Sequence, residues 1–308
     1  FQDSGQYWDA WNIDPNYTDH PLNPPILKEI QPLETGPVQW RWRIVRQFGS
    51  SEFCQDYILS AGSPVLQIAS VVDWRERHVL VKAAFPLNVE ADFATYEMPC
   101  GAISRPTKPE TPAEKAKWEV PAIRWADISD ANMGVSLLNN CKYGYDAQPH
   151  QLRLTLLRGA TWPDPEADLG KHEFTYAVYP HGGSWQAAGV VRRGLELNVP
   201  LDVWQMDNLS QPPSSGGLTL PPEGKFLDLS AENLILMAVK RAEDNPQSWI
   251  LRCYECHGVG AQLQLQSDLE LGLLHRVDLL EEEIGVTDGE ISVISPWQIA
   301  SFRFVVGL

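Results

Sequence analysis

No apolar run in this sequence reaches the length of a transmembrane helix, and no signal peptide opens the chain. The sequence therefore predicts no membrane span. The first residue is Phe1 rather than Met, which favours a piece excised from a longer protein.

Basic residues are scarce, because 24 Lys and Arg stand against 40 Asp and Glu, which leaves a formal net charge of −16. A surface with this charge repels phosphate groups, which argues against nucleic acids and anionic membranes as partners. A neutral substrate is compatible with the charge, whereas a polyanion is not.

Cysteine is scarce too, and five cysteines in 308 residues do not suggest a disulfide framework. Cys253 and Cys256 form a lone C-x-x-C pair, and the adjacent His257 is not at ligand spacing. We therefore expect no zinc site in this chain and a reducing, cytoplasmic location.

Recognisable catalytic patterns are missing as well. We find no Gly-rich phosphate loop, no G-x-S-x-G elbow and no Cys–His dyad, and the seven histidines are scattered. Glycoside hydrolysis needs two facing carboxylates, and Asp164, Glu166 and Asp168 share one Pro-rich loop. Carboxylates two and four residues apart on such a loop more often shape it or orient a substrate. The sequence thus predicts no catalytic residue and no metal ligand in this chain.

Tryptophan and proline, in contrast, are abundant, with 12 and 24 residues, as in an aromatic-rich β protein with many turns. Apolar and alternating patterns predict strands over 38–44, 56–60, 65–72, 79–87, 90–106, 152–156, 174–178, 234–240, 249–255, 260–266 and 300–306. One helix is expected within 184–197. The fold class predicted from these patterns is all-β.

The segment 211–224, QPPSSGGLTLPPEG, contains four prolines and three glycines and predicts a linker or a long surface loop. We therefore expect a β domain over 1–210 and a smaller β domain over 225–308. The first 25 residues are polar and proline-rich and predict an extended arm. We interpret its aromatic residues Tyr7, Trp8 and Trp11 as a packing anchor rather than a binding face.

The stretch 134–185 organises the chain as strand, polar turn, strand, long acidic loop and strand. Its turn carries hydrogen-bonding groups and aromatic rings, the groups that recognise neutral sugars: Asn139, Asn140, Lys142, Tyr143 and Tyr145. Its loop, 158–171, holds two prolines, two glycines, three acids and Trp162. A loop this long between strands is usually functional. A polar hairpin with an exposed rim explains the same composition equally well.

Long motifs also give the chain a resemblance to a known family. They are DAWNID (9–14), DWRERHVLVKAAFPLNVEADFATYEMPCGAISRPT (73–107), KWEVPAIRWADIS (117–129), NNCKYGYD (139–146), LLR (156–158) and PDPEADLGKHEFTYAVYPH (163–181). In this order they resemble the C-terminal β-domain region of glycoside hydrolase family 38 α-mannosidases. The branch they resemble most is typified by cytosolic and bacterial enzymes, and the resemblance spans nearly the whole chain.

The resemblance implies a large antiparallel super-sandwich of the galactose-mutarotase type with a smaller C-terminal β domain. It also implies that the catalytic aspartates and the zinc ligands belong to an N-terminal α/β domain, whose motifs do not occur in this sequence. This region would support that catalytic domain of the same chain and complete its sugar pocket. The intact enzyme would be a retaining, zinc-dependent glycosidase acting on mannose-containing glycans.

Residues of the acidic loop and of the polar turn are expected at the rim of that pocket: Arg158, Asp164, Asp168, Asn140, Lys142, Tyr143 and Tyr145. Arg158 is the first candidate, because a planar guanidinium can bind vicinal hydroxyls or orient a carboxylate bidentately.

Two alternatives stay open. One is an independent carbohydrate-binding module that uses Trp162, Tyr143 or Tyr145 as stacking platforms. The other is a mutarotase-like aldose epimerase, which rests on analogy of fold alone.

Overall fold

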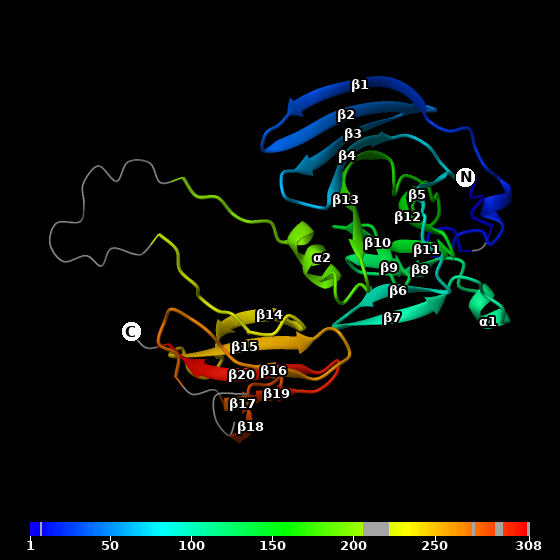
Figure 1. Cartoon of the computed structure of the whole chain (residues 1–308). Coiled ribbons are helices and arrows are strands. Elements are labelled where there is room, and N and C mark those ends of the chain that lie inside the picture. The colour runs from blue at the N-terminus through cyan, green and yellow to red at the C-terminus, as the bar shows by residue number, and fades with distance from the viewer. Residues whose placement is uncertain (7, 206–221, 273–274, 287–291, 307–308) are drawn as a thin grey trace. The chain divides into compact units, whose positions relative to one another are not determined.

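The computed structural model of the chain describes residues 1–6, 8–205, 222–272, 275–286 and 292–306 (Figure 1). The chain forms two compact units, Phe1–Val199 and Pro200–Leu308, and each has a hydrophobic core of its own. Most of the linker predicted at 211–224 lies outside the described residues.

The first unit contains a nine-stranded antiparallel sheet with the strand order β1-β2-β3-β4-β13-β10-β9-β6-β7. Its strands are β1 (Ile26–Thr35), β2 (Gln39–Phe48), β3 (Ser51–Ser60), β4 (Leu66–Trp74), β6 (Phe93–Met98), β7 (Gly101–Pro106), β9 (Trp125–Ser129), β10 (Met133–Asn139) and β13 (Gly170–Gly182). A four-stranded sheet has the order β5-β12-β11-β8. Its strands are β5 (Leu80–Pro86), β8 (Val120–Pro121), β11 (Gly144–Gln148) and β12 (Gln151–Arg158). The larger sheet curls around the smaller one (Figure 1).

The core of this unit lies between the two sheets, because alternate residues of each strand point inward. Ile68 of β4 and Tyr176 of β13 share one apolar cluster with Leu152 and Leu154 of β12. Burial of each such side chain stabilises the fold by roughly 1.5–3 kcal/mol. The smaller sheet is therefore held against the inner face of the larger one.

Helices are few and short among the described residues: the 3-10 turn η1 (Tyr17–Asp19), α1 (Pro112–Lys115) and α2 (Val190–Asn198). The helix predicted within 184–197 is α2, which begins at Val190. Its N-cap residue Gly189 has a left-handed φ of 64°, which is not helical and therefore sets the start of the helix. Helix α2 packs on β9 and β10. A Cβ on Gly194 would lie 3.1 Å from the Trp125 ring of β9, so any larger residue there would push the ring by a few tenths of an ångström.

The N-terminal arm precedes β1 and is anchored by residues that the sequence reading did not select. Tyr17 is only 2% exposed, and its ring meets that of Phe1 edge-on at 5.2 Å between centroids. Trp8 and Trp11 are 71% and 67% exposed, so their interpretation as a packing anchor is wrong. Tyr7 lies outside the described residues.

The second unit is a smaller antiparallel β structure with sheet orders β14-β15-β20-β17-β18 and β16-β19. Its strands are β14 (Leu234–Arg241), β15 (Ser248–Glu255), β16 (Ala261–Leu263), β17 (His275–Val277), β18 (Glu283–Val286), β19 (Ser292–Ile294) and β20 (Ile299–Val305). Leu251, Cys253 and Phe302 are fully buried in its core.

The predicted all-β class, a large antiparallel sandwich followed by a smaller β domain, is confirmed. Where the chain is described, none of its helices has the length and apolarity that crossing a bilayer requires.

Candidate functional site

An open hollow of about 330 Å³, here called the arm hollow, lies where the N-terminal arm meets the turn before β11 and the end of β12. Its lining residues are Ala10, Trp11, Asn12, Ile13, Glu119, Cys141, Lys142, Tyr143, Gly144, Thr155, Leu156, Leu157, Arg158, Asp168 and His172. Four residues predicted at a sugar-pocket rim thus meet here: Lys142, Tyr143, Arg158 and Asp168.

Arg158 is the last residue of β12, and its guanidinium holds the arm in place. It forms an ion pair with Asp3, whose side chain is 1% exposed, and it donates to the backbone carbonyls of Asp9 and Asn12. A buried carboxylate requires such a cation and its hydrogen bonds. The sequence led us to expect that the Arg158 guanidinium is free to reach a sugar. Instead, it binds the N-terminal arm of the same chain.

Asp9 joins the arm to the acidic loop that follows β12. Its Oδ2 accepts hydrogen bonds from the backbone N–H groups of Thr161, at 2.7 Å, and of Trp162, at 3.1 Å. The Trp11 and Trp162 rings meet edge-on with centroids 5.3 Å apart, and both remain more than half exposed. Arm and loop thus form one structure that presents two indole rings to solvent.

Lys142 is the one ammonium group in the lining of the arm hollow. Its Nζ lies 4.5 Å from the centroid of the Phe174 ring, and no carboxylate of the described residues forms an ion pair with it. Partial burial lowers the pKa of Lys142 from its ordinary value. The group is therefore a cation that a hydroxyl-rich or anionic ligand could engage without first breaking an ion pair.

Tyr143 and Asp168 complete the polar lining. The Tyr143 side chain is 54% exposed. The Oδ2 atom of Asp168 accepts a long hydrogen bond of 3.3 Å from the Ala160 N–H, and its backbone carbonyl accepts one of 2.7 Å from His172 Nε2. The carboxylate thus keeps acceptor capacity in a hollow that an exposed phenol ring also lines, and such groups together can bind sugars.

The other three predicted rim residues lie elsewhere. Tyr145 is fully buried, and its hydroxyl donates to the Leu137 carbonyl and accepts from Asn139 Nδ2 at 2.7 Å, so its prediction as a stacking platform is wrong. Asn140 is exposed and accepts from the Thr175 N–H at 3.0 Å. Asp164 is exposed and accepts from the Glu166 N–H at 2.9 Å, which shapes the loop.

Sequence reasoning missed Trp11, Glu119 and His172, which also line the arm hollow. The motif DAWNID, which contains Trp11, was the available signal, but its aromatic ring was assigned to packing. Glu119 belongs to a buried ionic cluster with Lys82 and Asp146, and the Lys82 side chain is fully buried. Burial by itself lowers the pKa of Lys82, but the two carboxylates outweigh it and raise that pKa, so the ion pairs stay charged.

Ser136, His181 and Asp127 have the residue types of a hydrolytic triad but not its geometry. His181 Nε2 lies 2.8 Å from Asp127 Oδ2 and 3.3 Å from Ser136 Oγ, while the buried Nδ1 has no hydrogen-bond partner among the described residues. A triad needs the acid and the serine on opposite ring nitrogens. All three side chains are also buried, so the cluster is structural.

Within the described ranges, no group of three or more His, Cys, Asp or Glu residues is placed to hold a metal ion. The C-x-x-C residues Cys253 and Cys256 are both buried. Burial raises the pKa of the Cys253 thiol to about 12. The pair supplies two thiols, and no third ligand among the described residues joins it.

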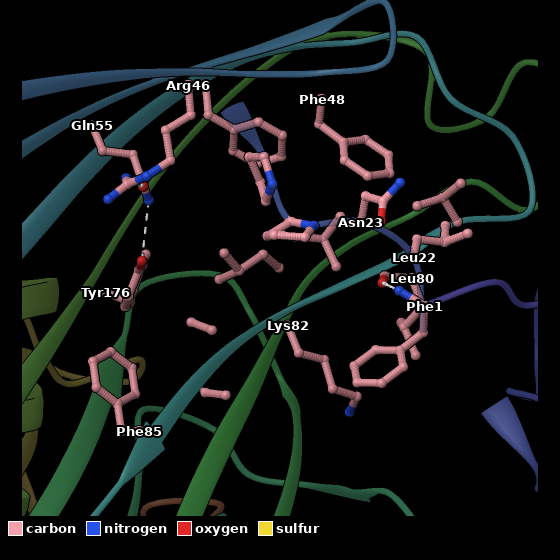
Figure 2. A pocket seen from close by; sticks show the side chains of 18 of the residues that line it. Phe1, Leu22, Asn23, Arg46, Phe48, Gln55, Leu80, Lys82, Phe85 and Tyr176 are labelled. Atoms are coloured by element: carbon pink, nitrogen blue, oxygen red, sulfur yellow. Dashed lines mark hydrogen bonds between the residues drawn. The ribbon is translucent and has the colours of Figure 1, made fainter. Parts of the chain in front are cut away.

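A second opening of about 420 Å³, here called the inter-sheet cavity, lies between the inner faces of the two sheets of the first unit (Figure 2). It is lined by Phe1, Leu22, Asn23, Pro24, Pro25, Arg46, Phe48, Phe53, Gln55, Tyr57, Val79, Leu80, Val81, Lys82, Ala83, Ala84, Phe85, Leu156 and Tyr176. None of these described residues is a His, Asp or Glu, the usual acid–base groups for proton transfer at a sugar ring. The lining of this cavity therefore gives the epimerase alternative no support.

Two family models match the chain. Residues 1–166 match the glycosyl hydrolases family 38 C-terminal domain, and residues 233–302 match the glycosyl hydrolases family 38 C-terminal beta sandwich domain. The first match covers more than half of the 308 residues and ends within the acidic loop.

Relatives of known name are alpha-mannosidases. Alpha-mannosidase 2C1 of Mus musculus is 33% identical over 325 residues, and that of Homo sapiens is 34% identical over 319 residues. Each match covers 99% of this chain and 30% of the relative, so the chain spans about three tenths of their length.

A solved structure has the same fold. The crystal structure of an alpha-mannosidase from Enterococcus faecalis V583 superposes with a TM-score of 0.74 at 16% identity, over 90% of this chain and 35% of that chain. Fold, motifs and family models agree. The chain belongs to glycoside hydrolase family 38, of whose members it represents the C-terminal β region.

Proposed function

We propose that this chain is the non-catalytic C-terminal region of an α-mannosidase and that its arm hollow completes the sugar pocket of the catalytic domain in the same polypeptide. The substrates are mannose-containing glycans, and zinc is bound by the catalytic domain. The observation that carries this proposal is the convergence of Lys142, Tyr143 and Asp168 with the exposed Trp11 ring in one hollow.

The geometry of the hollow supports a positioning role rather than a bond-breaking role. Asp168 is the carboxylate of the acidic loop that lines the arm hollow. The other carboxylate in the lining, Glu119, already accepts hydrogen bonds from the Lys82 ammonium group and the Thr155 hydroxyl. A group that orients the substrate lowers the barrier without touching the bond that breaks. The chain alone is therefore expected to be inactive toward an aryl α-mannoside, with or without added zinc.

The proposal is tested by substituting Lys142 in the full-length enzyme. Lys142→Met keeps an unbranched apolar side chain, one atom shorter, and removes the ammonium group together with its contact with the Phe174 ring. We expect kcat/KM for an aryl α-mannoside to fall roughly tenfold, which corresponds to about 1.4 kcal/mol, with the melting temperature unchanged.

Lys171→Met is the matched control, because Lys171 is exposed, pairs with Glu173 and does not line the arm hollow. If both variants retain the activity of the parent enzyme, the hollow does not face the sugar. Turnover by the isolated chain that survives repurification would also contradict the proposal.

A second function, an independent carbohydrate-binding module, is favoured by one observation. Trp11 and Trp162 expose two adjacent rings, and sugars stack on exposed aromatic faces. Titration of the isolated chain with mannose or mannobiose, followed by tryptophan fluorescence, separates the two functions. Saturable quenching that Trp162→Ala abolishes would promote the binding module, whereas the pocket proposal expects no saturation.

We also propose that the protein works in the cytoplasm. All five cysteines are free thiols, and Cys141 is exposed, which suits a reducing compartment. Immunofluorescence of the full-length protein in its own host tests this location.

A further inference from the structure

The inter-sheet cavity has an aromatic and apolar body. Six aromatic side chains line it: Phe1, Phe48, Phe53, Tyr57, Phe85 and Tyr176. Val81 and Ala83 of β5 form one wall, here called the floor, and the exposed arm residues Leu22 and Pro24 also line the cavity. Small-molecule sites typically combine a cavity of this size with apolar walls and a few polar groups.

The polar groups at one end of the cavity offer more hydrogen-bond donors than acceptors. Gln55 is already saturated: its carbonyl oxygen accepts from Arg46 at 3.0 Å, and its amide nitrogen donates to the hydroxyls of Ser70 and Tyr176, each at 3.1 Å. Figure 2 shows Arg46, Gln55 and Tyr176 together at this end. What remains is guanidinium N–H of Arg46 and the hydroxyl protons of Tyr57 and Tyr176. Burial raises the pKa of Tyr176, so its hydroxyl stays a donor.

Arg46 differs from the other arginines of its strand in having no counter-ion. Arg41 and Arg43, on the opposite face of β2, both bind the carboxylate of Asp56. Arg46 forms no ion pair with any described residue, and no carboxylate lines the inter-sheet cavity, although the chain has 40 acidic residues. Lys82 also lines the cavity, but its ammonium group is paired with Glu119 and Asp146.

We propose that the inter-sheet cavity binds a small organic monocarboxylate with an apolar body, whose carboxylate lies on Arg46 and the hydroxyls of Tyr57 and Tyr176. The apolar part fills the aromatic walls. A carboxylate supplies acceptors and the counter-ion that Arg46 lacks among the described residues, and a guanidinium binds it through two parallel hydrogen bonds. A sugar suits the cavity less well, because its hydroxyls need acceptors as well as donors. This site is separate from the arm hollow, and the inference does not depend on the proposed function.

The test is calorimetric titration of the 308-residue chain with 4-phenylbutyrate, 4-phenylbutan-1-ol and 4-phenylbutylamine. The three probes share one apolar body and differ in charge. We expect the carboxylate to bind at least about tenfold more tightly than the alcohol, and the amine to bind most weakly. Equal affinity of the acid and the alcohol would overturn the assignment.

Two variants locate the site. Arg46→Gln is expected to reduce the affinity for 4-phenylbutyrate to that for the alcohol, while Arg75→Gln, at an exposed arginine paired with Asp73, is the control that leaves it unchanged. Ala83→Leu extends the floor into the cavity and is expected to weaken both the acid and the alcohol. The melting temperature of each variant confirms folding. Parental affinity in a folded Arg46→Gln or Ala83→Leu protein refutes the proposal.

Discussion

Removal of the Arg158 guanidinium is the most direct test of how the N-terminal arm is held. In Arg158→Ala the Asp3 carboxylate stays buried without its cation, and the carbonyls of Asp9 and Asn12 lose a donor. Loss of one partner from a buried ion pair costs about 3–5 kcal/mol. The arm can limit this cost by detaching, because it returns Asp3 to water when it does so.

Arg75→Ala is the matched control, since Arg75 and Asp73 form an exposed ion pair with both side chains at least half exposed. Such a pair contributes about 0–1 kcal/mol. Urea denaturation followed by tryptophan fluorescence measures both free energies of unfolding, and limited proteolysis within residues 1–25 detects a detached arm. We expect Arg158→Ala to lose at least about 3 kcal/mol or to become sensitive to protease in the arm.

A double-mutant cycle that combines Arg158→Ala with Asp3→Asn measures the interaction free energy between Asp3 and Arg158. The double variant should lose less stability than the sum of the single variants, because each single change leaves an unpaired group. If Arg158→Ala costs no more than Arg75→Ala and leaves the arm resistant, the anchor role is refuted. Arg158 would then again be a candidate for direct contact with the sugar.

Two further predictions concern titratable groups. Hydrogen bonds from Arg43 lower the pKa of Asp56 from its ordinary value of 3.8, so its stabilising effect is complete above that pH and is lost as the pH falls through the lower folded-state value. Asp56→Asn should therefore weaken the loss of stability that thermal melts show below about pH 4; an unchanged acid profile would contradict this. Among the cysteines, iodoacetamide should label the exposed Cys141 in the native protein, while Cys253, a buried thiol whose pKa is raised to about 12, should react only on unfolding. Rapid native labelling of Cys253, seen by peptide mass spectrometry, would contradict its burial.

Local patterns were sufficient to predict the strands, because alternation of apolar and polar residues requires only that one face of a strand be buried. Leu152, Leu154 and Leu156 predicted β12, and Phe174, Tyr176 and Val178 predicted β13. The all-β class followed from such segments. The same local reasoning predicted a helix within 184–197 but not its first residue, because the left-handed conformation of Gly189 is not visible in a hydrophobic pattern.

The sequence also determined which segments carry polar and aromatic groups, and four of its seven rim residues line one hollow. Only the tertiary structure decided what each group does there. Tyr143 and Tyr145 are two residues apart in one motif, yet one is exposed and the other buried, because Tyr145 points into the space between the sheets. Asp3 and Arg158 are separated by 155 positions, so no local pattern could show that the Arg158 guanidinium binds a carboxylate of the arm. Long-range packing buried or paired some of the predicted binding groups, such as Tyr145 and Arg158. It left others, such as Lys142, without an ion-pair partner among the described residues.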